Sequence, residues 1–169
     1  LHSLRRRQRQ MCIRDSITPI KFRFDIACAG RLGMELQPKR MDDAEKRFAR
    51  KAVASYKAYR DIVMEGDLYR IGTPYDDTGY YGMMYVSKDK KKAVLFTYCI
   101  RYQSRTLIPK FRLHGLDAKT RYTVREQNTD KKRFWFDGGT FTGEYLANAG
   151  INPNRSKIDD SAVFVLEAQ

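Results

Sequence analysis

The chain has 169 residues, a formal charge of +13 at pH 7 and 12% aromatic residues. This length fits one domain, or one domain with an appendage, and allows a sizeable core. No run of about 18 apolar residues occurs, which excludes a membrane-spanning helix. Eleven tyrosines and nine phenylalanines against one tryptophan favour a protein with many half-buried strands.

The positive charge is unevenly distributed, and this bears on whether a nucleic acid is the partner. Residues 1–16 (LHSLRRRQRQMCIRDS) hold five Arg and one Asp, a net charge of +4, which leaves +9 on the other residues. Two further basic clusters, 88–92 and 131–133, fall between strand-like runs. Solvated turns explain them more simply than a binding groove does, and the aromatic pattern of an RNA-recognition sheet is absent. We therefore expect no nucleic-acid partner and no membrane contact.

Residues 1–16 show neither helical nor strand periodicity, and they lack the apolar core of a signal peptide. The chain begins with Leu, and this segment resembles a translated sequencing-adaptor string found at the ends of metagenomic contigs. We expect 1–16 to be a non-native basic tail, an assembly artefact joined to the coding sequence near residue 17. The alternative is a basic arm that binds RNA or an anionic surface.

Two helices are predicted in the first third of the chain. Pro19 suits a helix start, and the apolar residues after it indicate a short helix over 20–29. The pair Asp42 and Glu45 forms a capping-box pattern at the start of a second, amphipathic helix over 43–64, and Gly66 suits its end. Apolar residues recur along that helix at spacings of four and three, in one stripe: Phe48, Ala52, Tyr56, Tyr59 and Val63. This stripe must cover another part of the protein.

After Gly66 the apolar period changes to two, which indicates strands. Turn residues separate about seven short candidates, and a helical turn is expected over 143–149. Pro109 inside one candidate suggests an edge strand or a bulge. The pattern predicts a mainly β protein, an antiparallel Greek-key sandwich preceded by two helices. The candidate strands are 67–72, 80–86, 93–102, 107–113, 120–126, 134–136 and 161–167.

Cysteine and histidine give no sign of a metal or nucleophile site. Cys12, Cys28 and Cys99 show no CxxC spacing and have no histidine nearby, so they are expected to be reduced, partly buried thiols of a cytosolic protein. His2 and His114 are the only histidines, and His114 precedes a glycine, as in a turn. No phosphate-binding, dinucleotide or hydrolase motif occurs. We expect no cofactor and no metal.

The acidic residues were tested as catalytic pairs. Two carboxyls that act together across a substrate bond stand roughly 5 Å apart and come from different strand ends. Adjacent residues point in different directions, so the pairs Asp42/Asp43, Asp76/Asp77 and Asp159/Asp160 are interpreted as a cap and two solvated loops. Asp25 lies in a basic, aromatic helix and is expected to form a surface ion pair. No catalytic residue is predicted.

Exposed aromatic residues offer an alternative, because sugars stack on Trp and Tyr. Trp135, flanked by Phe134 and Phe136, or the pair Tyr80/Tyr81, could serve in a stand-alone carbohydrate-binding module. Alternation along a strand, however, buries one member of each neighbouring pair, and a single Trp more often fills a core. The module remains the alternative to a purely structural β-domain.

Several strings, in this order, resemble the glycoside hydrolase family 36 α-galactosidases, especially those of gut Bacteroides-like bacteria. The resemblance covers nearly all of residues 17–169. The strings are IKFRFDIACAGRLGMELQP (20–38), YRDIV (59–63), GDLYRIGTPYDD (66–77), MMYVS (83–87), KAVLFTY (92–98), FRLHGLDAKTRY (111–122), FTGEYLANAGIN (141–152) and VFVLEA (163–168).

This resemblance implies a layout of an N-terminal β-sandwich, a (β/α)₈ barrel and a C-terminal β-sandwich. Family members hydrolyse terminal α-galactosides with retention, using two aspartates in barrel motifs that precede the matched region. Neither motif occurs here, and a barrel needs about 250 residues. The expected chain is therefore a C-terminal fragment without catalytic residues, with 17–65 as the last barrel helices and 66–169 as the sandwich.

Further properties follow from the resemblance alone. The parent protein is expected to be a bacterial cytoplasmic homo-oligomer that meets its α-galactoside substrate through the barrel. In the fragment, part of the apolar stripe of the long helix is expected to be unpaired and sticky.

Overall fold

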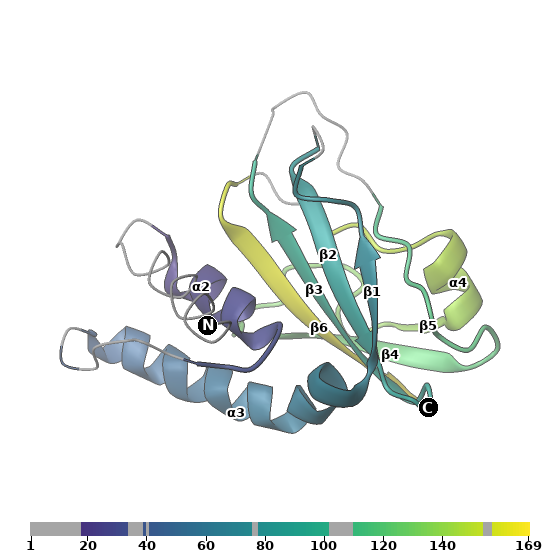
Figure 1. Cartoon of the computed structure of the whole chain (residues 1–169), viewed down its shortest axis with the longest axis horizontal. Helices are drawn as coiled ribbons and strands as arrows, with labels where there is room; N and C mark the ends of the chain where they lie inside the picture. Colours follow the sequence, from purple (N-terminus) through teal and green to yellow (C-terminus); the bar gives the residue numbers. More distant parts are fainter. Residues whose placement is uncertain (1–17, 34–38, 40, 76–77, 102–109, 154–156) are drawn as a thin grey trace, which may run out of the picture.

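The computed structural model describes residues 18–33, 39, 41–75, 78–101, 110–153 and 157–169 (Figure 1). No helix in these ranges is both long and apolar enough to cross a membrane. The elements are, in chain order, α2 (Ile20–Cys28), α3 (Asp43–Glu65), β1 (Asp67–Ile71), β2 (Tyr80–Val86), β3 (Lys92–Cys99), β4 (Arg121–Gln127), β5 (Thr140–Thr142), α4 (Gly143–Asn148) and β6 (Asp160–Ala168).

The strands form one six-stranded antiparallel sheet in the order β1-β2-β3-β6-β4-β5. β1, β2 and β3 follow one another as neighbours, whereas β6 returns from the end of the chain to lie between β3 and β4. The predicted architecture, mainly antiparallel β preceded by two helices, is confirmed. The hydrogen bonds add that the described strands all join a single sheet.

Strand β3 shows how the sheet divides the core into two layers. Ala93, Leu95 and Cys99 belong to one apolar cluster. Val94, Phe96 and Tyr98 belong to a second cluster on the other face. Both faces are covered, so every residue from 93 to 99 is buried. Covering on both sides explains why this strand is a continuous apolar run rather than an alternating one.

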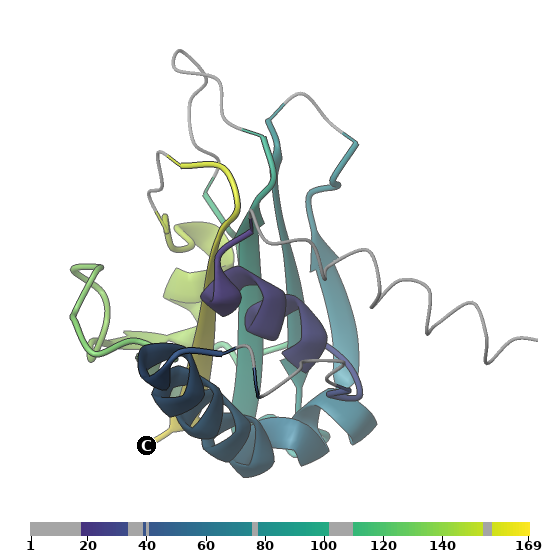
Figure 2. The same ribbon diagram turned by 90° about the vertical axis from the view of Figure 1, so that its left-hand side faces the viewer.

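Helices α2 and α3 cover one face of the sheet, as Figures 1 and 2 show. Their residues Phe22, Tyr59 and Val63 share a cluster with sheet residues such as Phe96 and Tyr98. The apolar stripe of α3 faces inward: Ala52 is fully buried, and the Phe48 ring packs edge-on against Phe24 at 5.6 Å. The expectation of an unpaired, sticky stripe is therefore wrong, because α2 and the sheet cover it.

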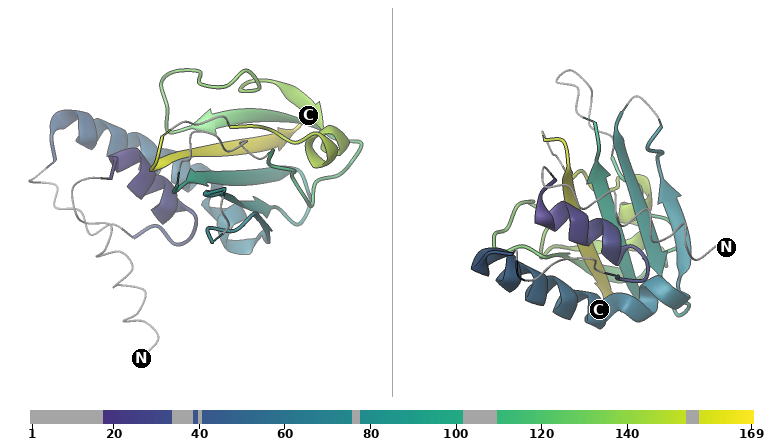
Figure 3. Two further views of the ribbon diagram at one scale, coloured as in Figure 1. Left: turned by 90° about the horizontal axis from the view of Figure 1, so that it is seen from above. Right: turned by 60° about the vertical axis from the view of Figure 1, so that its left-hand side comes forward.

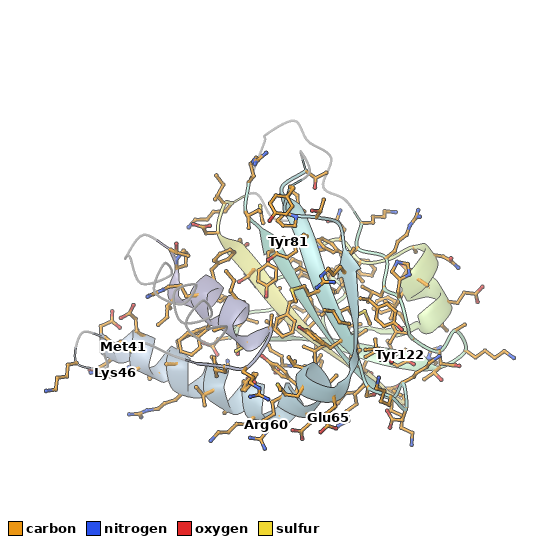
Figure 4. All side chains as sticks on the ribbon, in the orientation of Figure 1. Met41, Lys46, Arg60, Glu65, Tyr81 and Tyr122 are labelled. Atoms are coloured by element: carbon orange, nitrogen blue, oxygen red, sulfur yellow. The ribbon has the colours of Figure 1, made fainter. Side chains whose placement is uncertain are left out.

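The ends of α3 follow from its sequence. Asp42 accepts a hydrogen bond from the Glu45 backbone N–H at 2.7 Å, and the Glu45 carboxylate accepts one in return from the Asp42 backbone at 3.3 Å. The predicted capping box is confirmed. The charged residues of the outer face, among them the labelled Lys46 and Arg60, point away from the sheet (Figure 4).

The second face of the sheet is covered by α4 and by irregular chain. Figure 3 shows α2 in front of the sheet and α4 behind it. Phe111 and Ile151 form an isolated bridge with two backbone hydrogen bonds of 2.8 and 3.0 Å, and the Leu113 N–H donates to the Leu146 carbonyl at 3.0 Å. These bonds hold the chain before β4 against α4.

Two predicted strands need correction, and one observed strand was not predicted. Residues 134–136 lie in a turn, which is closed by hydrogen bonds from the Asp137 N–H to the Phe134 carbonyl and from the Gly139 N–H to the Phe136 carbonyl, although burial still alternates along them. Residues 110–113 make only the bridge at Phe111, and 102–109, with Pro109, lie outside the described residues. Strand β5 was missed because its three residues, all half-buried, carry no clear alternation.

Gly66 is predicted to be required where α3 passes into β1. Its backbone is not strained, but a Cβ there would lie 2.7 Å from the Val86 carbonyl oxygen. We expect Gly66→Ala to lower the free energy of unfolding by about 1–3 kcal/mol, since the β2 backbone must move aside. Urea denaturation measures this.

Gly30→Ala is the matched control, because a Cβ at Gly30 meets nothing within 4 Å. It should change stability by no more than about 0.5 kcal/mol. Equal losses in the two variants would contradict the close-approach explanation.

Candidate functional site

Asp25 is an ionisable residue with no exposed surface, and it lies where α2 meets the sheet. Its Oδ1 accepts a hydrogen bond from Asn128 Nδ2 at 2.9 Å, and its Oδ2 accepts one from Ser161 Oγ at 2.7 Å. Lys21 Nζ, one helical turn away, lies 2.5 Å from Oδ2. The expected ion pair at Asp25 is present, but its expected place on the surface is wrong, because this face of α2 packs on the sheet.

Four structural elements bring these partners together, and we name the group the Asp25 network: Lys21, Asp25, Tyr98, Asn128 and Ser161. The Tyr98 hydroxyl, from β3, donates to the Asp25 carbonyl at 3.0 Å. Asn128 follows β4 with φ of 57°, a left-handed conformation that Asn adopts more readily than most residues. Ser161 lies at the start of β6. The network therefore joins α2 to three strands of the sheet.

Each charged group in and near the network lies next to a group of opposite charge. Burial lowers the pKa of Lys21, and the adjacent Asp25 carboxylate opposes that effect. Nearby, the Arg133 guanidinium binds the Glu126 carboxylate with two nitrogens and lies 3.3 Å from Asp160. Its Nη2 also donates to the Ser161 carbonyl at 3.0 Å. Each of these buried or half-buried charges thus has an opposite partner, as burial requires.

Chemically, this arrangement supports the fold. Both Asp25 oxygens already accept hydrogen bonds, and the side chain is fully buried, so a substrate does not reach it. A buried carboxylate satisfied in this way holds the surrounding elements in register. The sequence carried one signal of it, the four-residue spacing of Lys21 and Asp25. Asn128 and Ser161 could not be found from local spacing, because they lie 103 and 136 residues from Asp25.

Of the three carboxylate pairs considered in the sequence, the two that the structure describes do not converge on one site. Asp42 caps α3, and Asp43 beside it is exposed in the first turn. Asp160 bonds Arg133, while Asp159 has φ of 58° and donates its backbone N–H to the Cys99 carbonyl. Asp76 and Asp77 lie outside the described residues.

Cys28 and Cys99 are free and buried, as predicted, and burial raises the pKa of the Cys28 thiol to about 12. Such a thiol stays protonated and unreactive at neutral pH. His114 is exposed beside Gly115, which has a positive φ, so it lies in a turn as expected. Cys12 and His2 fall outside the described residues. The described Cys, His, Asp and Glu residues form no group of three that could hold a metal ion.

Trp135 departs most clearly from expectation, since it is 69% exposed instead of filling the core. Its neighbours Phe134 and Phe136 are buried and stack on each other at 5.2 Å. Tyr80 is buried and Tyr81 stacks on Tyr98 at 4.9 Å, so that pair presents no open platform. Burial alternates over 134–136, so Trp135 faces solvent once Phe134 and Phe136 face the core, and the local sequence does not show which side of the segment turns inward.

A shallow groove of about 360 Å³ lies between α3 and the sheet. Its walls combine apolar and charged residues, including the ion pair of Lys92 and Glu167 at 3.3 Å. Its members come from several elements, so no local motif predicts it. They are Ala58, Tyr59, Ile62, Lys92, Thr123, Arg125, Gln127, Val165, Glu167, Ala168 and Gln169.

Removing the Asp25 carboxylate is predicted to be costly. Asp25→Ala leaves the Lys21 charge, Asn128 and Ser161 without their acceptor in a buried place. We expect the free energy of unfolding to fall by about 3 kcal/mol. Chemical denaturation followed by circular dichroism measures it.

Asp61→Ala serves as the control, because the Asp61 side chain is 82% exposed and pairs only with exposed Arg60 among described contacts. Its effect should stay within about 0.5 kcal/mol. A loss at Asp25 as small as that at Asp61 would show that the network contributes little.

The sequence and the structure of this chain are similar to parts of known proteins. Alpha-galactosidase 2 of Hypocrea jecorina is 32% identical over 154 residues, which are 90% of this chain and 19% of that protein. The structure of alpha-galactosidase AgaA A355E D548N from Geobacillus stearothermophilus in complex with raffinose matches 91% of this chain with a TM-score of 0.79 and 26% identity. The alpha-galactosidase from Lactobacillus brevis matches with a TM-score of 0.74 and 30% identity. The chain spans about one fifth of the length of these relatives.

The model of the glycosyl hydrolase family 36 C-terminal domain matches residues 80–166, which run from the first residue of β2 to within two residues of the end of β6. This range contains the shared core of the sheet, the 134–139 turn and α4. The chain therefore belongs to glycosyl hydrolase family 36, as its C-terminal domain.

Proposed function

We propose that this chain is part of a retaining α-galactosidase and that it supports the catalytic barrel of its parent without supplying catalytic, cofactor-binding or metal-binding residues. The observation that carries the proposal is the structural match over 91% of the chain to α-galactosidases of which it covers 20%. The H. jecorina and G. stearothermophilus relatives are both named as α-galactosidases.

The state of the acidic residues supports a structural role. Retaining hydrolysis of a glycoside needs two carboxyls about 5 Å apart on either side of the bond. Here Asp25 is enclosed by its network, Asp42 caps a helix, and Glu126 and Asp160 both contact Arg133. These carboxylates are already engaged in holding the fold together.

Helices α2 and α3 are the part of this chain that we propose to belong to the barrel. We assign 17–65 to the last helices of the barrel, 66–169 to the C-terminal β-domain and 1–16 to a non-native tail. Phe22, Tyr59 and Val63 of the helices share one core with the sheet. A barrel that ends in these helices would thus be continuous with the β-domain, and the sheet would hold its last helical layer in place.

The remaining properties concern the parent protein. We propose a bacterial cytoplasmic homo-oligomer that binds its α-galactoside in the barrel and has neither a nucleic-acid nor a membrane partner. The basic run 88–92 supports the absence of a nucleic-acid partner, because Lys88 pairs with Asp67, and Lys92, the first residue of β3, pairs with Glu167 at 3.3 Å. The exposed Trp135 favours one second candidate, a carbohydrate-binding module.

The proposal predicts activity only when the chain is joined to a barrel. The purified 169-residue chain should not hydrolyse an aryl α-galactoside. The protein expressed from the genomic reading frame that includes the sequence upstream of residue 17 should hydrolyse it, with release of the α-anomer of galactose. Chromogenic assay and NMR of the product measure these outcomes.

Two results would overturn the proposal. One is turnover by the 169-residue chain that is lost when one of its own carboxylates is replaced. The other is a joined protein that folds but hydrolyses a different glycoside and no α-galactoside. A preparation from cells carrying the empty vector controls for host galactosidases.

A further inference from the structure

We propose that Trp135, Phe141 and Tyr145, together named the aromatic surface, bind the terminal galactosyl ring of an α-galacto-oligosaccharide by stacking. The site is a binding surface on the β-domain, and the choice of sugar rests on the function proposed above. Its geometry does not depend on that function. Three observations carry it: the rigidity of the turn, the arrangement of the rings, and the size of the exposed patch.

The turn that presents Trp135 is fixed on both sides. Phe134 and Phe136 insert into the core, where both contact the ring of Phe164 at 5.5 and 5.4 Å. The turn is also tied to β4: the Gly138 N–H donates to the Val124 carbonyl at 2.7 Å, and the Val124 N–H donates to the Gly139 carbonyl at 2.9 Å. A tryptophan held on such a turn loses little conformational freedom on binding a ligand.

The three rings are contiguous and oriented. The Trp135 ring lies 5.8 Å from that of Phe141, nearly perpendicular to it, and Phe141 stacks on Tyr145 at 5.3 Å. Gly139 makes room for this arrangement, because a Cβ there would lie 2.8 Å from the Phe141 ring. Trp135 and Tyr145 are 69% and 41% exposed. Two ring systems therefore face solvent, supported by a third.

The size of the patch favours a sugar over a protein partner. Aromatic side chains bury roughly 150–250 Å² each when fully covered, so the exposed parts of Trp135 and Tyr145 offer on the order of 250 Å². A stable protein interface needs about 800 Å² from each partner. A pyranose ring is of the right size, and galactose has one face lined with C–H groups that can lie against an indole.

The aromatic surface lies on the side of the sheet that the proposed barrel does not cover. Phe136 and Phe141 pack with the core cluster that contains Leu146 of α4, on the face of the sheet opposite α2 and α3 (Figure 3). In the proposed function, the helical layer is the side that joins the barrel. The aromatic surface then lies on the layer that faces away from that junction.

The test uses the full chain, in which Trp135 is the only tryptophan and so reports directly on the surface. Raffinose is titrated while tryptophan fluorescence is recorded, with sucrose, which is raffinose without its galactosyl ring, as the matched ligand. We expect a saturable change with raffinose in the millimolar range and none with sucrose. Tyr145→Leu, which keeps apolar volume on Phe141, should weaken binding about tenfold.

Tyr75→Ala is the control variant, since Tyr75 is 91% exposed and forms no described ring contact. It should leave the raffinose affinity unchanged. The proposal fails if raffinose gives no saturable change, if sucrose gives the same change, or if Tyr145→Leu, shown by circular dichroism to be folded, binds as tightly as the parent chain.

The experiments distinguish failure of the aromatic surface from failure of the α-galactosidase assignment. Loss of raffinose binding with an active joined enzyme would reject the aromatic surface and leave the α-galactosidase assignment in place. Raffinose binding by this chain, together with a joined protein that hydrolyses no α-galactoside, would reject the assignment and support the surface.

Discussion

The Asp25 carboxylate joins parts of the chain that are far apart in sequence. The carboxylate accepts hydrogen bonds from Asn128 and Ser161, and the backbone carbonyl of Asp25 accepts one from the Tyr98 hydroxyl. A buried carboxylate without such donors costs several kcal/mol. The position of α2 therefore depends on β3, β4 and β6 being correctly placed, and the helical layer and the sheet become a single structural unit.

This dependence is reinforced by the packing of the helices on the sheet. The apolar stripe of α3 packs on α2 and the sheet, and Tyr56 and Tyr85 donate hydrogen bonds to the Gly30 and Ala29 carbonyls just after α2. The opposite face is closed by α4 and the 134–139 turn. Each layer is thus filled by this chain's own residues. The aromatic surface and the shallow groove beside α3 are among the features that face solvent.

The sequence predicted elements that depend on local chemistry. The capping box at Asp42 and the stripe of α3 were confirmed, and the strand expected over 93–102 is observed as β3 at Lys92–Cys99, because caps and periodicity act over a few residues. The Asp25 network and the exposure of Trp135 could not be predicted in this way. The first needs contacts across more than 100 residues, and the second depends on which side of the 134–139 turn faces the core, where Phe134 and Phe136 on either side of Trp135 are buried.

Native-state hydrogen exchange tests most directly whether the helical layer and the sheet are one unit. If Asp25 joins them, the backbone amides of Asp25 to Cys28 in α2 should exchange with the same opening free energy as those at the centre of β3 and β6. If the α2 amides exchange far faster while the β3 and β6 amides stay protected, the helices are only loosely attached and the account is contradicted.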